Sequence, residues 1–234
     1  MKIYAHRGAS YDFPEMTLAA YENAVLQGAD GFECDLRLTK DSVPILWHDP
    51  TMDRCARNSA VVAESTYEEI KNIYPDVMTF AELLNFAIEE KKSLLLETKH
   101  PVPTGTLIEE VVIANLHNKK KEIEKSKISI NVMSFSWFAL EKVKRLDPKV
   151  SLTLLMRQST PGYAARFTSA QTLGPSVEQL RKKPSIALEI KKSGRSLAAW
   201  TADSQSDIEL CRHLGVDSLI TNRPEYARSI LARS

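Results

Sequence analysis

The chain has 234 residues, of which 43% are hydrophobic and 26% are charged, so it has the composition of a globular protein rather than a disordered one. Its net charge of +1 gives no reason to expect a nucleic acid as the main partner. Three cysteines, at positions 34, 55 and 211, match neither a disulfide framework nor a zinc-binding spacing.

The N-terminal residues predict a strand from Lys2 to His6, which leaves no room for a signal peptide before it. No apolar run approaches the roughly 18 residues that a membrane span requires. We therefore expect a cytoplasmic protein with no stable insertion into a membrane.

Short apolar runs alternate with segments of helical periodicity along the rest of the chain. After the first strand, further strands are expected at 31–39, 43–47, 93–99, 128–135, 151–156, 169–173, 196–201 and 217–221. Helices are expected at 17–27, 66–73, 79–91, 105–120, 137–146, 176–192, 204–214 and 224–232.

This alternation, with no break in composition, predicts an α/β protein with a parallel sheet and one domain over residues 1–234. Eight strand–helix units in this length fit a (β/α)₈ TIM barrel. The segment at about 50–77 has no strong periodicity and becomes a small insertion after the second strand, over the mouth of the barrel. A doubly wound open sheet is the alternative fold.

Four short polar sequences lie near the expected carboxyl ends of strands, where such barrels carry their sites. They are His6-Arg7-Gly8, Glu33-Cys34-Asp35, His48-Asp49 and Glu97-Thr98-Lys99. Residues two apart on a strand share a face, so Glu33 and Asp35 point the same way, as do Glu97 and Lys99. Carboxylates hold hard divalent cations, histidines transfer protons, and Arg and Lys bind phosphate. The set therefore predicts metal-assisted cleavage of a phosphate ester.

Further short sequences complete an ordered series over essentially the whole chain. The series is His6-Arg7-Gly8-Ala9, Pro14-Glu15-Met16-Thr17, Glu33-x-Asp35, His48-Asp49, Glu97-x-Lys99, Ala199-Trp200-Thr201 and Thr221-Asn222-Arg223-Pro224. It resembles the glycerophosphodiester phosphodiesterases of the bacterial, cytoplasmic type. The resemblance implies a barrel that hydrolyses glycerophosphodiesters, which are small-molecule substrates, to sn-glycerol 3-phosphate and an alcohol.

The resemblance also implies roles for individual residues. Glu33, Asp35 and Glu97 would hold one divalent cation, Mg²⁺ or Ca²⁺. His6 and His48 would form the acid–base pair, with His6 acting on the nucleophile and His48 protonating the departing alcohol. The nucleophile is either water or the glycerol hydroxyl of the substrate, and the sequence does not choose between them. Arg7 and Lys99 would contact the phosphate, and Trp200 is either an apolar wall for the glycerol moiety or simple barrel packing.

One position departs from the family, which usually has Asn where this chain has Met16. If Thr17 caps the following helix, Met16 and Tyr21 have the spacing of a hydrophobic staple. The alternative is that a hydrogen bond of the loop has been lost near the site.

Two other functions stay open. A phosphodiesterase of lysophospholipase D type would be favoured by an apolar groove in the insertion. A degenerate barrel that binds without catalysis is opposed by the complete set of acid–base and carboxylate positions.

Overall fold

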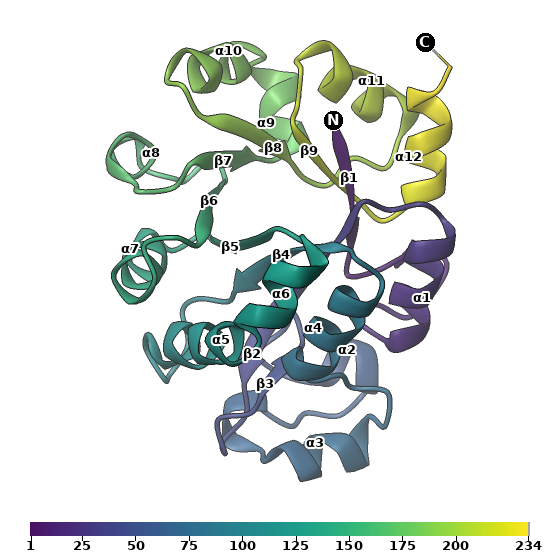
Figure 1. The fold of residues 1–234 in the computed structure, drawn as a ribbon, viewed down its shortest axis with the longest axis vertical. Helices are drawn as coiled ribbons and strands as arrows, with labels where there is room; N and C mark the ends of the chain where they lie inside the picture. The colour runs from purple at the N-terminus through teal and green to yellow at the C-terminus, as the bar shows by residue number, and fades with distance from the viewer. Residues whose placement is uncertain (234) are drawn as a thin grey trace.

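A computed structural model describes residues 1–233 and contains a closed parallel sheet surrounded by helices (Figure 1). The parallel strands are β1 (Lys2–His6), β2 (Gly31–Leu38), β4 (Ser93–Thr98), β5 (Ile130–Ser134), β6 (Ser151–Met156), β7 (Thr172–Pro175), β8 (Ser196–Ala199) and β9 (Ser218–Thr221). Each pairs with the next in this order, and β9 returns to β1. The predicted (β/α)₈ barrel is confirmed, and the open doubly wound sheet is wrong.

Helices connect the strands along the outside of the barrel. They are α1 (Leu18–Leu26), α4 (Phe80–Glu89), α5 (Leu107–Asn118), α6 (Lys120–Ser126), α7 (Trp137–Leu146), α8 (Gly162–Phe167), α9 (Val177–Lys182), α10 (Ser185–Lys192), α11 (Gln205–His213) and α12 (Pro224–Leu231). The predicted caps of two of them are present: Thr17 accepts from the N–H of Ala20, and Thr79 forms a capping box with Glu82.

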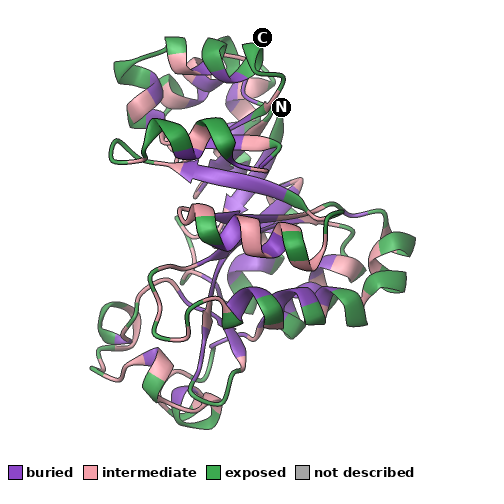
Figure 2. Cartoon of the chain, turned by 90° about the vertical axis from the view of Figure 1, so that its left-hand side faces the viewer, coloured by how far each residue is buried: buried purple, intermediate pink, exposed green. Residues whose placement is uncertain are grey.

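Figure 2 shows buried residues along the strands and on parts of the helices. Their side chains form two layers around and inside the barrel. The larger layer lies between strands and helices, and the smaller fills the barrel with Tyr4, Leu95, Met133, Leu155 and Ile220. Gly31 makes room for that filling, because a Cβ there would lie 2.6 Å from the ring of Tyr4. The layer inside the barrel is the floor on which the functional side chains stand.

Two predicted elements were misplaced for reasons that the structure makes clear, and one short helix was missed. The predicted helix at 176–192 is two helices, because Pro184 has no N–H to continue the first. The predicted strand at 169–173 begins only at Thr172, since the backbone N–H and hydroxyl of Ser169 donate to Glu141 at 2.7 Å instead. The short helix α8 was not predicted, because its sequence has no clear helical periodicity.

The insertion follows β3 (Pro44–Leu46), a short strand antiparallel to β2. It contains α2 (Asp53–Ala56), the 3₁₀ helix η1 (Val62–Glu64) and α3 (Tyr67–Ile73), and it projects from the lower side of the barrel in Figure 1. Its apolar side chains pack on one another around Trp47, Met52 and Ile70. Part of the insertion therefore forms a small core of its own. Four of its residues, Pro50, Val61, Val62 and Ala63, also line a pocket of about 80 Å³.

Within residues 1–233, no helix combines the length and apolarity needed to cross a membrane.

Candidate active site

On several strands, one side chain lies inside the barrel and the side chain two residues later lies at its carboxyl-terminal rim. Tyr4 and His6 on β1, and Leu95 and Glu97 on β4, follow this alternation, as do Ile220 and Asn222 at the end of β9. In each pair the first residue packs inside the barrel and the second stands above it. Strand geometry thus gathers the polar side chains at the carboxyl ends of the strands.

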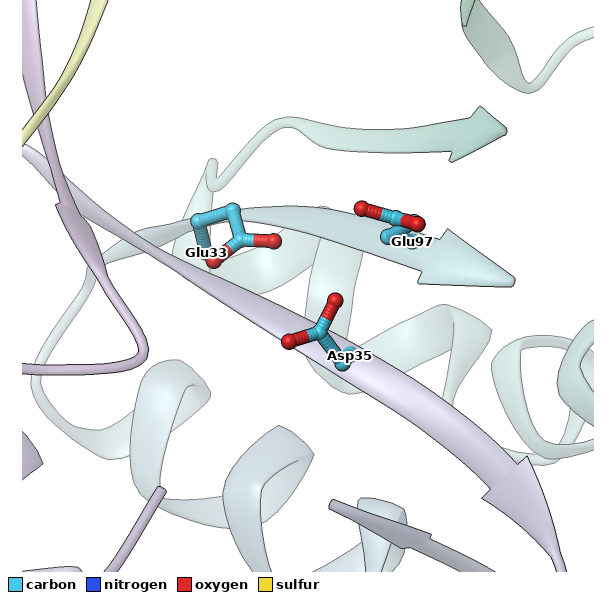
Figure 3. A group of neighbouring side chains, drawn as sticks. All are labelled: Glu33, Asp35 and Glu97. Atoms are coloured by element: carbon cyan, nitrogen blue, oxygen red, sulfur yellow. The ribbon is translucent and has the colours of Figure 1, made fainter. Parts of the chain in front are cut away.

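Glu33, Asp35 and Glu97 form one buried cluster (Figure 3). Asp35 and Glu97 are register partners on β2 and β4, and His6 and Glu33 are partners on β1 and β2. One carboxylate oxygen from each of the three lies within 4.8 Å of the others. Three buried oxygen ligands at this spacing fit a hard divalent cation such as Mg²⁺ or Ca²⁺.

Two cations stand beside this cluster. The Nε of Arg7 lies 2.8 Å from Asp35, and the Nζ of Lys99 lies 2.7 Å from Glu97 and 3.1 Å from Asp35. Both cations line the central pocket as well. They are therefore placed to act on an anionic group entering that pocket, as expected of residues that contact phosphate.

The three carboxyl groups differ in their pKa values. Burial opposes ionisation of Asp35, but the charges of Lys99 and Arg7 hold its pKa at about 2. Burial and the charge of Asp35 raise the pKa of Glu97 to about 7, and the same two causes raise the pKa of Glu33 well above its usual value. Arg7 and Lys99 thus do not supply enough positive charge to hold the pKa values of all three carboxyl groups low, and a bound divalent cation would add it.

His6 is held by a chain of hydrogen bonds from β9. Asp203 accepts from the backbone N–H of Asn222 at 2.8 Å and from its Nδ2 at 2.5 Å, so the amide oxygen of Asn222 faces away from Asp203. That oxygen lies 2.7 Å from His6 Nδ1. Because an amide oxygen only accepts, His6 donates from Nδ1, and in the neutral ring the lone pair is then on Nε2. Burial and the charge of Arg7 lower the pKa of His6, which favours the neutral base.

His48 has a different partner. Its Nδ1 lies 2.7 Å from a carboxylate oxygen of Asp49, and the second oxygen of Asp49 accepts from Arg54 at 2.6 Å. Arg54 also contacts Glu15, which lies in the loop before α1. A carboxylate partner stabilises the protonated imidazole, whereas burial lowers the pKa of His48. The insertion and the first loop together fix this side chain.

The central pocket has a volume of about 150 Å³. Of the predicted site residues, all except Asp35 line it, and Asp35 contacts Arg7 and Lys99 directly. Trp200 forms part of its apolar wall: the indole N–H donates to the carbonyl of Gly174 at 2.7 Å, and the ring meets Phe135 edge-on at 5.4 Å. Trp200 thus both packs in the barrel and faces the pocket.

Sequence reasoning assigned no role to several residues of the site. Asn222 and Glu15 occurred in the motif series, but no pattern tied Asn222 to His6, which is 216 positions away in the chain. Asp203, Arg54 and Phe135 gave no signal of their own. Their parts follow from contacts between distant strands and loops, which local patterns do not report.

Comparison with known proteins identifies the family. The model of the glycerophosphoryl diester phosphodiesterase family matches residues 6–226. A probable glycerophosphodiester phosphodiesterase 1 of Mycobacterium tuberculosis is 33% identical, with 98% of this chain and 92% of the relative covered. A glycerophosphodiester phosphodiesterase of Caldanaerobacter subterraneus is 31% identical over 95% of this chain and 94% of the relative.

Solved structures agree with this fold. A putative glycerophosphoryl diester phosphodiesterase from Agrobacterium tumefaciens superposes with a TM-score of 0.87 at 21% identity, covering 100% of this chain and 98% of the other. A phosphodiesterase of Oleispira antarctica, solved with the product sn-glycerol 3-phosphate, gives 0.82 at 22% identity over 99% and 97%. On the family match and the identity to its relatives, the chain belongs to the glycerophosphoryl diester phosphodiesterase family and is a phosphodiesterase.

Proposed function

We propose that this protein hydrolyses glycerophosphodiesters to sn-glycerol 3-phosphate and an alcohol, with one divalent cation and two histidines as the acid–base pair. The observation that carries the proposal is the convergence of a buried three-carboxylate cluster, two histidines and two cations on one small pocket. The Oleispira phosphodiesterase that holds sn-glycerol 3-phosphate shares the fold and supports the choice of product.

Glu33, Asp35 and Glu97 would hold the cation, Mg²⁺ or Ca²⁺, which when bound polarises the phosphoryl group and offsets its developing negative charge. Arg7 and Lys99, which flank the carboxylates and line the pocket, bind the phosphate through charge-assisted hydrogen bonds. The apolar wall with Trp200 receives the carbon skeleton of the glycerol.

The two histidines differ in what they can do. His6, which donates from Nδ1 to Asn222, has its lone pair on Nε2 and takes the proton of the nucleophile, either water or the glycerol hydroxyl of the substrate. If the hydroxyl attacks, a cyclic phosphate forms and is hydrolysed afterwards. His48, whose Nδ1 faces the carboxylate of Asp49, gives a proton to the leaving alcohol.

Removal of the cation tests the proposal directly. We expect chelator to abolish turnover of glycerophosphodiesters, and Mg²⁺ or Ca²⁺ to restore it. Glu97→Gln removes one carboxylate, so it should weaken cation binding measured by calorimetry and raise the cation concentration needed for turnover. Glu109→Gln is a control, since that buried carboxylate pairs with His100 outside the cluster. Full activity in excess chelator would refute the metal assignment.

Two further features belong to the proposal. We propose that the chain forms one domain, because all the strands join one sheet and the insertion is attached to it through β3. We place the protein in the cytoplasm, where a reducing environment suits the free thiols of Cys34, Cys55 and Cys211.

A further inference from the structure

A second pocket adjoins the central one at the carboxyl ends of β5 and β6. It has a volume of about 430 Å³, against about 150 Å³ for the central pocket. Phe135 lines both, and His100 of the second pocket follows Lys99 of the first. Sites for whole drug-sized ligands are roughly 300 Å³ or more. A diester with a sizeable headgroup therefore extends out of the central pocket, and the adjoining pocket is the neighbouring space that shares a wall with it.

The walls of this adjoining pocket are aromatic and hydroxylated. Phe135, Trp137, Phe138 and Tyr163 line it, together with the hydroxyl-bearing residues Ser136, Ser159 and Thr160. Phe138 and Tyr163 are 73% and 61% exposed, so their rings are not buried in the core and remain accessible to a ligand. Flat apolar faces beside hydrogen-bonding groups suit a ligand that has both carbon-bound hydrogens and hydroxyls.

The charge of the adjoining pocket has one sign. Arg157 lines it and lies with its guanidinium 4.1 Å from the centre of the Phe135 ring. No Asp or Glu is among the lining residues. Within residues 1–233 the guanidinium has no carboxylate partner; its charge is turned to the aromatic face and to the pocket. Because Arg157 covers the Phe135 face and lines the pocket, a quaternary ammonium bound there would lose that face and meet a like charge.

We propose that the adjoining pocket is the subsite for the leaving alcohol, and that it selects an uncharged polyol over a cationic amino alcohol. The proposal rests on the proposed phosphodiesterase function and adds its headgroup class. The aromatic rings carry the carbon skeleton, while the hydroxyl-bearing side chains and Arg157 bind its hydroxyl groups. Choline and ethanolamine are disfavoured by the charge of Arg157.

The experiment compares two diesters whose leaving alcohols are similar in size but differ in charge: glycerophosphoglycerol and glycerophosphoethanolamine. With saturating cation and low salt, we expect kcat/KM to favour the glycerol headgroup by about 3- to 10-fold. Like charges roughly 6 Å apart predict this size in a water-filled pocket with an effective dielectric constant of about 40 to 80. High salt should shrink the preference, because exposed charges are screened. Arg157→Ala should bring the ratio near unity, and Arg157→Glu should reverse it.

A matched control is available on α8. Arg166 also lies over an aromatic ring, that of Phe167 at 5.4 Å, but it does not line the adjoining pocket. Arg166→Glu should keep the wild-type ratio, which separates a local effect of Arg157 from a change in net charge. Melting temperatures of all variants show that each is folded.

Each remaining outcome has one meaning. Turnover without a charge preference, or a preference that Arg157→Glu leaves unchanged, overturns the subsite while the phosphodiesterase function stands. A lysophosphatidylglycerol that is a better substrate than glycerophosphoglycerol, independently of Arg157, assigns the pocket to an acyl chain and also overturns the inference. If the wild-type protein cleaves neither diester at any cation concentration, the proposed function itself fails.

Discussion

His6 and His48 both lose basicity on burial, yet each faces a different kind of partner. The amide of Asn222 fixes a neutral tautomer of His6, whereas the carboxylate of Asp49 favours a charged His48. This difference between two residues of one type is the basis on which we propose His6 as the base and His48 as the acid. It also makes the assignment testable with substrates that differ only in their leaving group.

We expect His48→Ala to lose about 10²–10⁴-fold in kcat with an alkyl leaving group, because general acid catalysis has that typical size. With a nitrophenyl leaving group, which departs readily as an anion, most of that loss should disappear. His6→Ala should impair both substrates, since the nucleophile still has to lose its proton. Rates for both variants on both substrates, at saturating cation, decide the matter. The opposite pattern would exchange the two roles.

Glu97 gives a prediction for stability in the absence of cation. Its pKa of about 7 in the folded protein lies above the ordinary value of 4.5, so the folded state binds more protons than the unfolded state between these pH values. The free energy of unfolding should therefore fall as the pH rises from 5 through 7, by up to about 3 kcal/mol. Denaturant titrations in chelator measure this slope.

The same titrations have a clear control. Glu97→Gln cannot titrate and should reduce the slope to the part that Glu33 contributes, because the pKa of Glu33 is raised as well. Glu89→Gln, a change at an exposed position on α4, should leave the slope as it is. Saturating Mg²⁺ or Ca²⁺ should also remove the slope, because a bound cation favours the ionised carboxylates. A stability that rises over this pH range would contradict the proposed charge state of the cluster.

At the scale of the element, the start of α1 shows how the chain accommodates its departure from the family. Met16 has a φ of 57°, a left-handed conformation in which Asn is far more common than Met. Its side chain is buried with Tyr21 in the core, as the staple reading predicts. Core packing therefore holds a residue whose backbone conformation would suit the usual Asn.

Two substitutions of Met16 distinguish the effect of its backbone conformation on stability from the effect of its buried side chain. Met16→Ala and Met16→Gly both remove the buried side chain and should both lower stability. The glycine variant should be the more stable by about 0.5–1 kcal/mol, because glycine adopts a positive φ freely, although it gains entropy when unfolded. The comparison should invert at Ala20 inside α1, where glycine lowers stability relative to alanine. Equal stability of the two Met16 variants would mean that the backbone is not strained.

Elements whose signals are local could be predicted from the sequence. The alternation of β2 predicted that Glu33 and Asp35 share a face, and the Thr79–Glu82 spacing predicted a capping box. The resemblance to the family added Glu97 to the carboxylate set, which the structure brings together. Elements set by distant contacts could not. Ser169 is held out of β7 by Glu141, and the insertion is tied to the first loop by Arg54 and Glu15. These contacts join residues far apart in the chain, so no window of sequence contains them.

At the scale of the whole molecule, closure of the barrel completes the active site. His6 stands on the first strand, and Asn222 follows the last one, which pairs with β1 from Lys2↔Ser218 to Ala5↔Thr221. The carboxylate cluster instead depends on β2 and β4. His6 and the carboxylate cluster are thus positioned by different parts of the barrel.

We therefore expect Asn222→Ala to reduce kcat by about 10- to 100-fold with alkyl and aryl leaving groups alike, the size typical of lost support behind a functional histidine. Cation affinity, measured by calorimetry, should be unchanged, because Asn222 makes no hydrogen bond to the three carboxylates. Asp203→Asn, which loosens the hold on Asn222, should act in the same direction more weakly. A loss confined to the alkyl substrate would contradict the link to His6.

The pairing of the first strand with the last also governs when activity can arise during synthesis. A ribosome releases β1 first, with the carboxylates of β2 and β4 following, but β9 and Asn222 emerge after all the other strands. Until then His6 lacks its partner, and a stalled or prematurely terminated chain carries the carboxylates without an aligned base. A chain that stops before β9 should therefore lack both the closing pair of strands and the hydrogen bond that orients His6.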